Sequence, residues 1–166
     1  EKKERVFQIL KSVRKYNTLN ERLQAIVESL VKYFDAVFAR VWFVDKKKKN
    51  LILKYSAGKY TRISGEFSRV PINSVKIGPV VKTKKAVVTN DVINDPRIKN
   101  HDWAKKEKLK SFAAYPLFYR GEPVAVLAMF SKKKMSHVDF EILGVFSDQI
   151  SKELVGFFEA KDFLSE

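Results

Sequence analysis

The sequence predicts an α+β domain built on a single antiparallel β-sheet of five or six strands. We expect the N- and C-terminal helices to cover one face of this sheet, and loops and short helices to lie over a pocket on the other face. Three observations predict this fold. Apolar residues recur at helical spacing at both ends of the chain, β-rich runs fill the middle, and short polar turns join those runs as hairpins.

The N-terminal third of the chain is predicted to be helical. Apolar residues recur at helical spacing from Val6 to Val13 and, after a polar break, from Leu23 to Phe34. Thr18 and Glu21 have the spacing of a capping box, in which each side chain bonds the backbone of the other residue. The second helix should therefore begin near Leu19.

The middle of the chain is predicted to form strands. Ala36–Val44 and Leu51–Ala57 are β-rich runs joined by a lysine-rich tip, which predicts an antiparallel hairpin. A short strand is expected at Phe67–Val70, where Pro71 should end it. A short helix is expected at Gly78–Lys84, because a proline follows its first residue and suits the first turn.

A second hairpin follows a long loop. The strand Ala86–Thr89 ends at Asn90-Asp91, and such short polar side chains favour turns. The loop after it is long enough to indicate a functional segment. Phe112–Tyr119 and Glu122–Phe130 then form two strands, joined by the tight turn Arg120-Gly121.

The last predicted element is a long helix. It should start after Ser136, which has Asp139 three residues later as a capping partner. Its apolar stripe continues to the end of the chain through Phe157, Phe158, Phe163 and Leu164. We therefore expect this helix to continue toward an output domain or a partner helix.

Charge and composition narrow the class of protein. The net charge is +14, carried mainly by lysine clusters at 46–49, 105–110 and 132–134. These clusters lie in expected loops without an aromatic-basic motif, so we expect no direct nucleic acid binding. No run of about 18 apolar residues occurs, and the charged start is not that of a signal peptide. We therefore expect a cytoplasmic protein without membrane insertion, and the abundance of lysine fits a thermophile.

Catalytic and metal-binding motifs are missing from the sequence. The absence of Cys excludes disulfides, thiolate catalysis and thiolate metal ligands. No nucleophile-elbow motif, phosphate-binding glycine loop or zinc-spaced pair of histidines occurs. Asp91, Asp95, His101 and Asp102 gather in one loop, but solvated carboxylates are the usual outcome of such a cluster. We therefore predict a protein that is not an enzyme and holds no metal or cofactor.

Five segments resemble, in order, the sequence blocks of a GAF domain: Phe67–Pro71, Lys76–Gly78, Thr89–Arg97, Asp102–Ala104 and Ser111–Leu117. The resemblance runs from about Leu23 to Glu153 and is closest to GAF domains of prokaryotic sensor histidine kinases and related signalling proteins. It implies residues 1–18 as an N-terminal helix or linker, 19–158 as the GAF domain and 159–166 as the start of a C-terminal signalling helix or linker.

The resemblance also bears on the ligand. GAF relatives that reduce methionine sulfoxide use cysteines, and those that hold a linear tetrapyrrole usually tether it through one, so neither chemistry is expected here. Several relatives that bind cyclic nucleotides carry an Asn-Lys pair, which does not occur in this sequence. Cyclic nucleotides are therefore ranked low as ligands.

A candidate ligand site follows from the alternation of side chains in the strand Ala36–Val44. Arg40 and Trp42 should face the loops, where an arginine needs an anionic or carbonyl partner. The predicted site residues are Arg40, Trp42, Tyr55, Arg69, Asp91, Arg97, Trp103, Phe112 and Tyr115. The three arginines are candidate anchors for a carboxylate or phosphate. In the alternative interpretation Asp91 caps a turn, Arg97 pairs with Asp95 or Asp102, and the aromatic residues belong to the core.

Two functions from different classes remain open at this point. The resemblance implies a regulatory sensor domain that binds a small, possibly anionic molecule and relays a conformational signal through its terminal helices. The output favoured by the resemblance is a histidine kinase of a two-component system, with a transcriptional activator next. The alternative is a ligand-free dimerisation or spacer module of a signalling protein or transcriptional activator. In both cases we expect a homodimer formed through the terminal helices.

Overall fold

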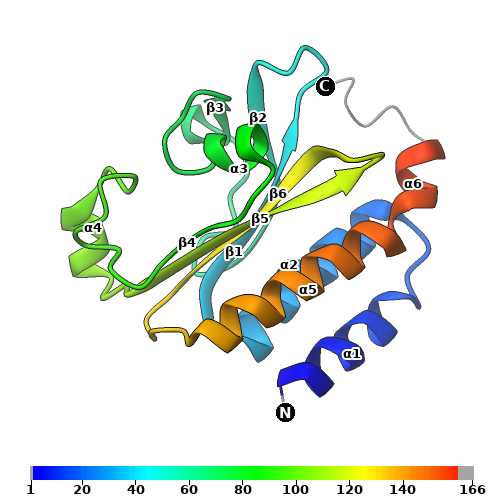
Figure 1. Cartoon of the computed structure of the whole chain (residues 1–166), viewed down its shortest axis with the longest axis horizontal. Coiled ribbons are helices and arrows are strands. Elements are labelled where there is room, and N and C mark those ends of the chain that lie inside the picture. The colour runs from blue at the N-terminus through cyan, green and yellow to red at the C-terminus, as the bar shows by residue number, and fades with distance from the viewer. Residues whose placement is uncertain (1, 161–166) are drawn as a thin grey trace.

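A computed structural model describes residues 2–160 of the chain. The fold is the predicted α+β domain with one antiparallel sheet of six strands in the order β3-β2-β1-β6-β5-β4 (Figure 1). The helices are α1 (Lys2–Val13), α2 (Leu19–Tyr33), α3 (Gly78–Thr83), α4 (His101–Lys106), α5 (His137–Glu153) and α6 (Val155–Ala160), with a 3-10 turn η1 (Glu66–Ser68). The strands are β1 (Ala36–Val44), β2 (Asn50–Gly58), β3 (Arg69–Pro71), β4 (Val87–Thr89), β5 (Ser111–Tyr119) and β6 (Glu122–Ser131).

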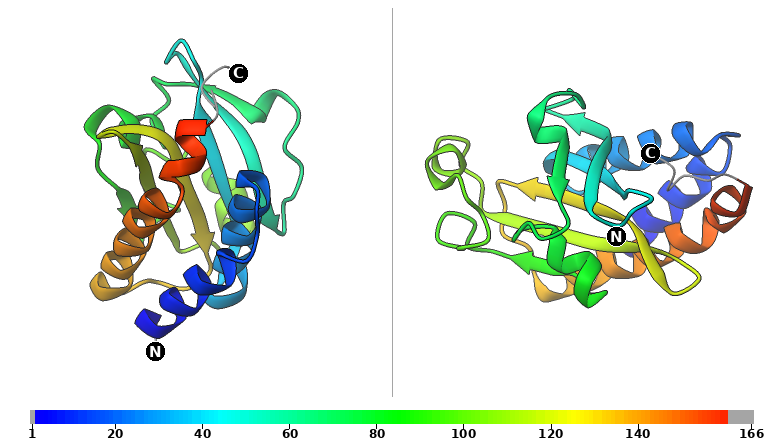
Figure 2. Two further views of the ribbon diagram at one scale, coloured as in Figure 1. Left: turned by 90° about the vertical axis from the view of Figure 1, so that its right-hand side faces the viewer. Right: turned by 90° about the horizontal axis from the view of Figure 1, so that it is seen from above.

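One face of the sheet is covered by the long helices, as predicted. Helix α2 packs on β1 and β2, α5 packs on β5, and α1 lies against both α2 and α5 (Figure 2). Leu23, Val27 and Phe146 in this layer are completely buried. Burial of a large side chain is worth about 1.5–3 kcal/mol, so this layer contributes much of the stability of the fold. We call this side of the sheet the helix face.

The other side, which we call the loop face, is covered by short elements. Helix α3 packs on β5 and β6, and apolar side chains of α4 and of the connecting segments, such as Ala104, Ile98 and Tyr60, pack on the same side. A second apolar cluster lies beneath them and includes Phe38 and Trp42 of β1, Phe112 of β5 and Phe130 of β6. The structure therefore has two cores, one on each face of the sheet.

The predicted helix starts are confirmed by their caps. The hydroxyl of Thr18 accepts a hydrogen bond from the backbone N–H of Glu21. Ser136 and Asp139 form a complete capping box, because each side chain bonds the backbone N–H of the other residue. Caps of this kind contribute about 1 kcal/mol each. They set the first residues of α2 and α5.

Two predicted elements differ from the structure. Phe67 belongs to η1 and precedes β3, because Gly65 with φ of +119° lets the chain turn sharply before the strand begins. Pro71 lies within β3, which is tolerated because β3 is an edge strand. The last helix is interrupted at Leu154, and Gly156, a poor helix former, follows in the first turn of α6. Its predicted continuation through Phe163 and Leu164 lies outside the described residues.

Within residues 2–160, no helix has the length and apolar character needed to cross a bilayer.

Candidate functional site

A hollow lies on the loop face between the sheet and the segments that cover it. It consists of two adjoining spaces of about 650 and 340 Å³ that share Arg40, Phe67, Lys76 and Trp103 in their linings. Beneath Arg40 and Lys76 a cavity of about 20 Å³ reaches the rings of β5 and β6. The larger volumes fall within the range of small-molecule sites. We call the three spaces together the loop-face hollow.

Arg40 enters the hollow from the middle of β1. Its Nε donates a hydrogen bond to Ser56 Oγ at 3.2 Å, and its guanidinium carbon lies 5.0 and 5.2 Å from the ring centroids of Phe38 and Phe67. Burial lowers the pKa of Arg40 from its ordinary value. Among the described residues, no carboxylate forms an ion pair with this guanidinium.

Lys76 enters the hollow from the segment between β3 and α3. Its Nζ lies 5.9 Å from the ring centroid of Phe112 and 5.3 Å from that of Phe130. Burial lowers the pKa of the Lys76 amine to about 8, and the nearby charge of Arg40 adds to this effect. Within residues 2–160 the amine has no hydrogen-bonding or carboxylate partner, so the rings are its only favourable contacts for a charge.

The lining of the hollow is strongly unbalanced in charge. No Asp or Glu lies among its described lining residues, whereas the lining contains the cations Arg40, Lys59, Arg62, Lys76, Arg97 and Lys99. Lys59 and Arg97 pair with acids that lie outside the lining, at Nζ–Oε1 2.5 Å to Glu107 and Nη2–Oδ2 2.7 Å to Asp95. Arg62 and Lys99 are exposed at the rim, so Arg40 and Lys76 remain as the inward cations without a counter-ion among the described residues.

Ser74 adds an unsatisfied hydroxyl to the same lining. Its Oγ is buried and has no hydrogen-bond partner among the described residues, and the residue lines the space of about 340 Å³. Leaving a buried hydroxyl unpaired costs about 1–3 kcal/mol, and such groups are rare in folded proteins. Ser74 and Lys76 lie two residues apart in one connecting segment, so both unsatisfied groups come from the same element.

The structure brings some of the predicted site residues together. Arg40, Trp42, Arg97, Trp103 and Phe112 all line the loop-face hollow. The alternation in β1 predicted the first two, because Ala39 and Val41 pack into the helix-face core on the opposite side.

Tyr55 and Tyr115 do not lie in the hollow, which corrects the predicted site. The Tyr55 hydroxyl bonds the side chain of Asn20 on α2, and the Tyr115 hydroxyl donates to the carbonyl of Phe140 on α5 at 2.7 Å. Tyr55 pairs with Val41 across the β1–β2 ladder, and paired residues share a face. Tyr115 is three positions after Phe112, and an odd separation in a strand places two side chains on opposite faces.

Arg69 and Asp91 also lie outside the hollow. Arg69 is exposed on the edge strand β3, with its Nη1 3.9 Å from Asp45 Oδ2. Asp91 is exposed in the turn after β4, where its oxygens accept hydrogen bonds from Asn94 Nδ2 at 3.0 and 3.3 Å. The turn-forming role that the alternative interpretation gave to Asp91 is therefore the one observed.

The loop after β4 is held by its own polar side chains. Asp95 accepts hydrogen bonds from the backbone N–H, Nε and Nη2 of Arg97, and this pairing holds the pKa of Asp95 well below its usual range. His101 Nε2 lies 2.8 Å from the carbonyl oxygen of Asp95. In the described part of the chain, no group of three His, Cys, Asp or Glu side chains is placed to hold a metal ion.

Several lining residues were not among the predicted site residues, above all Lys76 and Ser74. Both lie in an irregular segment, where no period tells which way a side chain points. Lys76 does belong to one of the blocks that resembled a GAF domain. That block was the one available signal for its role.

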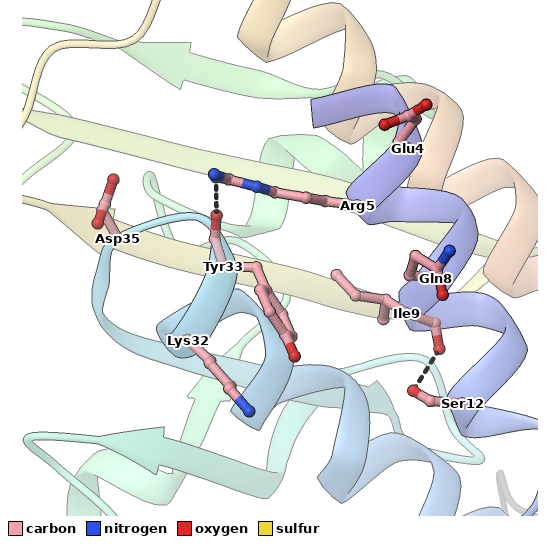
Figure 3. A pocket seen from close by; sticks show the side chains of 8 residues that line it. All are labelled: Glu4, Arg5, Gln8, Ile9, Ser12, Lys32, Tyr33 and Asp35. Carbon is pink, nitrogen blue, oxygen red and sulfur yellow. Dashed lines mark hydrogen bonds between the residues drawn. The ribbon is translucent and has the colours of Figure 1, made fainter. Parts of the chain in front are cut away.

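A second groove lies on the helix side, between α1 and α2, with a volume of about 850 Å³ (Figure 3). Its lining mixes acids and bases, including Glu4, Arg5, Lys32 and Asp35. Arg5 is already engaged, because its Nη1 donates to the carbonyl oxygen of Tyr33 at 3.2 Å. This groove therefore differs from the loop-face hollow, because acids as well as bases line it and Tyr33 is the one aromatic residue among its described lining residues.

Comparisons with known proteins agree on the fold. A family model described as "GAF domain" matches residues 17–154. A search of curated proteins finds no match to the chain.

Several solved structures superpose over nearly the whole chain. The GAF domain of a phosphoenolpyruvate-protein phosphotransferase from Coxiella burnetii has a TM-score of 0.81 at 16% identity, covering 95% of this chain and 94% of that one. Free methionine-R-sulfoxide reductase from Neisseria meningitidis, in complex with its substrate, has a TM-score of 0.79 at 21% identity, covering 96% and 92%. The GAF domain of A. aeolicus NLH2 has a TM-score of 0.72 at 18% identity, covering 96% of each chain. At these identities the likeness is one of fold.

Proposed function

The chain belongs to the GAF domain family, and from this premise we propose that it is a regulatory sensor domain that binds a small anionic molecule in the loop-face hollow. The observation that carries the proposal is the pair of inward cations, Arg40 and Lys76, in a hollow whose described lining contains no Asp or Glu. Both cations lie next to aromatic rings rather than next to a counter-ion.

The energetic argument is that an unpaired charge in an apolar site is unfavourable. Removing a charged group from water is costly unless an opposite charge or hydrogen bonds replace the water. Arg40 and Lys76 also repel each other, which is one cause of the lowered pKa of Lys76. An anion between them would relieve both effects. The two cations therefore favour an anionic ligand over a neutral one.

We propose binding without chemical conversion. Thiol chemistry is excluded because the sequence contains no Cys. General acid–base catalysis commonly uses His, Asp or Glu, and the described lining of the hollow contains none of these residues.

The signal would pass through the sheet to the helices. Arg40 lies on the loop face of β1, while its neighbours Ala39 and Val41 pack into the core beneath α2. A shift of β1 on ligand binding would therefore change the packing of the helix layer, which is a known type of switching transition. We propose a histidine kinase as the output, supported by the resemblance of the sequence blocks to GAF domains of such kinases.

The helix layer also supports the proposed homodimer. Phe7 on α1 and Val138 and Val145 on α5 are exposed by 61%, 56% and 58%. Val138 and Val145 are seven residues apart and share one side of α5. These exposed residues equally suit a ligand-free dimerising spacer, which is the second candidate function.

Light scattering should show that the domain is a dimer, and Val145→Glu should shift it toward the monomer. A wild type that is monomeric at high micromolar concentration argues against this interface.

Anion binding separates the sensor from the spacer. We expect a panel of small anions, namely phosphate, acetate and benzoate, to include at least one that raises the melting temperature, because a ligand that binds only the folded state stabilises it. Lys76→Met should abolish that shift. Lys152→Met, which removes the same charge from the exposed side of α5, should leave it unchanged. If no anion shifts the wild type, or if the two variants respond alike, the sensor proposal fails.

A further inference from the structure

We propose that the ligand of the loop-face hollow is a small aromatic carboxylate, with its carboxylate bound by Arg40 and Lys76 and its ring lying among the aromatic side chains of the lining. This inference rests on the proposed function and specifies its ligand. Three features of the hollow carry it: the fixed guanidinium fork, the apolar aromatic wall and the volume.

The guanidinium of Arg40 is presented as a planar fork. Its Nε is held by Ser56 Oγ, and its plane is fixed beside the rings of Phe38 and Phe67. Its two terminal nitrogens donate to no residue that the structure describes. A planar fork matches a carboxylate with two parallel hydrogen bonds.

The other donors do not by themselves distinguish a carboxylate from a phosphate. Besides Arg40, the lining contributes the amine of Lys76 and, buried in the same segment without a described hydrogen-bond partner, the hydroxyl of Ser74. A phosphate group carries close to two negative charges and three acceptor oxygens, and phosphate sites commonly use backbone N–H groups of glycine-rich loops or helix N-termini. The two cations match either group in charge, so the choice of a carboxylate rests on the planar fork of Arg40 and on the aromatic lining.

The lining around these donors is aromatic and apolar. Trp103 Nε1 donates to the Tyr60 hydroxyl at 3.1 Å, so the polar atoms of these two residues satisfy each other. Trp103 meets Phe130 edge to face, with centroids 5.6 Å apart and an interplanar angle of 88°. Phe38 meets Tyr60 in the same way, at 5.0 Å and 90°. Aromatic clusters with such geometry accept a further ring favourably.

The volume accommodates a ligand with one aromatic ring. The space that contains Trp42, Ser74 and Lys76 measures about 340 Å³, which is near the lower end of the range for ligand sites, roughly 300–1,000 Å³. A benzoate-sized molecule fits within this space, and the adjoining space of about 650 Å³ continues from it past Arg40, Lys76 and Trp103.

Intrinsic fluorescence gives a direct measurement of binding. The chain contains two tryptophans, and both Trp42 and Trp103 line the hollow. We therefore propose fluorescence titrations of the full chain with benzoate, acetate, inorganic phosphate and the neutral isostere benzamide. Benzoate should bind at least about tenfold more tightly than acetate or phosphate, because it buries a ring as well as a charge. Benzamide should bind at least about tenfold more weakly than benzoate, because it lacks the charge.

Each possible outcome of the titrations tests a different part of the proposal. If benzoate and acetate bind with equal affinity, the ring of the ligand is not recognised and the aromatic part of the inference is wrong. If benzamide binds as tightly as benzoate, the carboxylate is not recognised. If phosphate binds more tightly than benzoate, the ligand is a phosphate. In the last case the anion-sensor proposal survives. If none of the anions binds, both the inference and the proposed function are wrong.

Variants of Arg40 test the fork itself. Arg40→Lys keeps the charge but loses the planar fork, so benzoate affinity should fall at least about tenfold. Arg120→Gln changes one charge at the β5–β6 turn, away from the hollow, and should leave affinity unchanged. If Arg40→Lys loses the circular dichroism of the wild type, Lys76→Met supplies the second test with the same expected loss. Unchanged affinity in a folded variant of either residue would overturn the inference.

Discussion

The two faces of the sheet are both largely apolar, but they differ in whether their buried polar groups have partners. On the helix face the buried hydroxyls are bonded: Tyr115 donates to the carbonyl of Phe140 at 2.7 Å, and Ser147 donates to that of Leu143 at 2.9 Å. The largest side chains there, such as Phe146, are completely buried. This face follows the ordinary rule that buried polar groups find partners.

The loop face breaks that rule at one place. Arg40 and Lys76 face the same hollow without a counter-ion, and Ser74 Oγ has no partner within the described residues. Proteins commonly depart from optimal stability where they bind ligands. The difference between the faces indicates that one face stabilises the domain and the other is prepared for a ligand.

The largest expected effect tests the helix face. Phe146→Ala removes a completely buried ring that stacks on Phe34 with centroids 6.3 Å apart. We expect a loss of about 3–5 kcal/mol in the free energy of unfolding, as for other buried phenylalanines. Ile63→Ala, at a position exposed by 44% outside the helix layer, should change it by less than about 0.5 kcal/mol. Urea denaturation measures both, and equal effects would contradict the assignment of this face as the main core.

A smaller loss is expected from the ion pair that borders the hollow. Asp95→Asn removes the partner of Arg97 and leaves that guanidinium unpaired on the loop face. We expect a loss of about 1–2 kcal/mol at neutral pH, because the side chain of Asp95 is only 9% exposed but that of Arg97 is 36% exposed, so water replaces part of the lost interaction. Because the pKa of Asp95 is lowered in the folded state, its stabilisation is present at pH values above its unfolded pKa and declines as the pH falls through the lower folded pKa.

The pH dependence of stability gives the measurement for this pair. Between neutral and acidic pH the wild type should lose more stability than Asp95→Asn, which has no carboxylate to titrate at this position. Asp91→Asn, exposed in the same loop, should behave like the wild type. Parallel curves for the wild type and Asp95→Asn would show that the pair contributes no stability.

The next substitution is expected to stabilise the domain instead of destabilising it. Lys76→Met replaces an unpaired amine beside Phe112 and Phe130 with an apolar side chain of similar length. We expect the ligand-free domain to become more stable by about 1–2 kcal/mol, because an uncompensated charge leaves an apolar site. Lys152→Met should stay within about 0.5 kcal/mol of the wild type. A destabilised Lys76→Met would mean that Lys76 has a structural role instead.

The sequence predicted the fold well because regular elements carry periodic signals. Capping residues such as Thr18 and Ser136 marked helix starts, and alternation in β1 correctly placed Arg40 on the loop face. The same rule, applied to β5, separates Phe112 from Tyr115. The inclusion of Tyr115 in the predicted site was therefore an avoidable error.

The rest of the site could not be predicted in this way. Ser74 and Lys76 lie in an irregular segment, where tertiary contacts alone decide the direction of a side chain. The register shift between Val41 and Trp42 in the β1–β2 ladder is likewise invisible in the sequence, and it helps to decide the face of Tyr55. The lack of a counter-ion near Arg40 is the feature furthest from the reach of sequence analysis. It can be seen only when the positions of all neighbouring residues are known.

The smallest expected effect is the dependence of both ligand affinity and stability on pH. The pKa of Lys76 is lowered to about 8 from the ordinary value of 10.5, whereas Arg40 remains charged throughout this range. Benzoate affinity should fall by up to about tenfold between about pH 7 and pH 9, as the amine loses its charge. The stability of the ligand-free domain should rise as the pH increases from about 8 toward 10.5, because the folded state then no longer holds an unfavourable charge. Lys76→Met should remove both trends. Fluorescence titration and urea denaturation should therefore change in opposite directions with pH, and a common direction would contradict a ligand-binding role for the unpaired charge on the loop face.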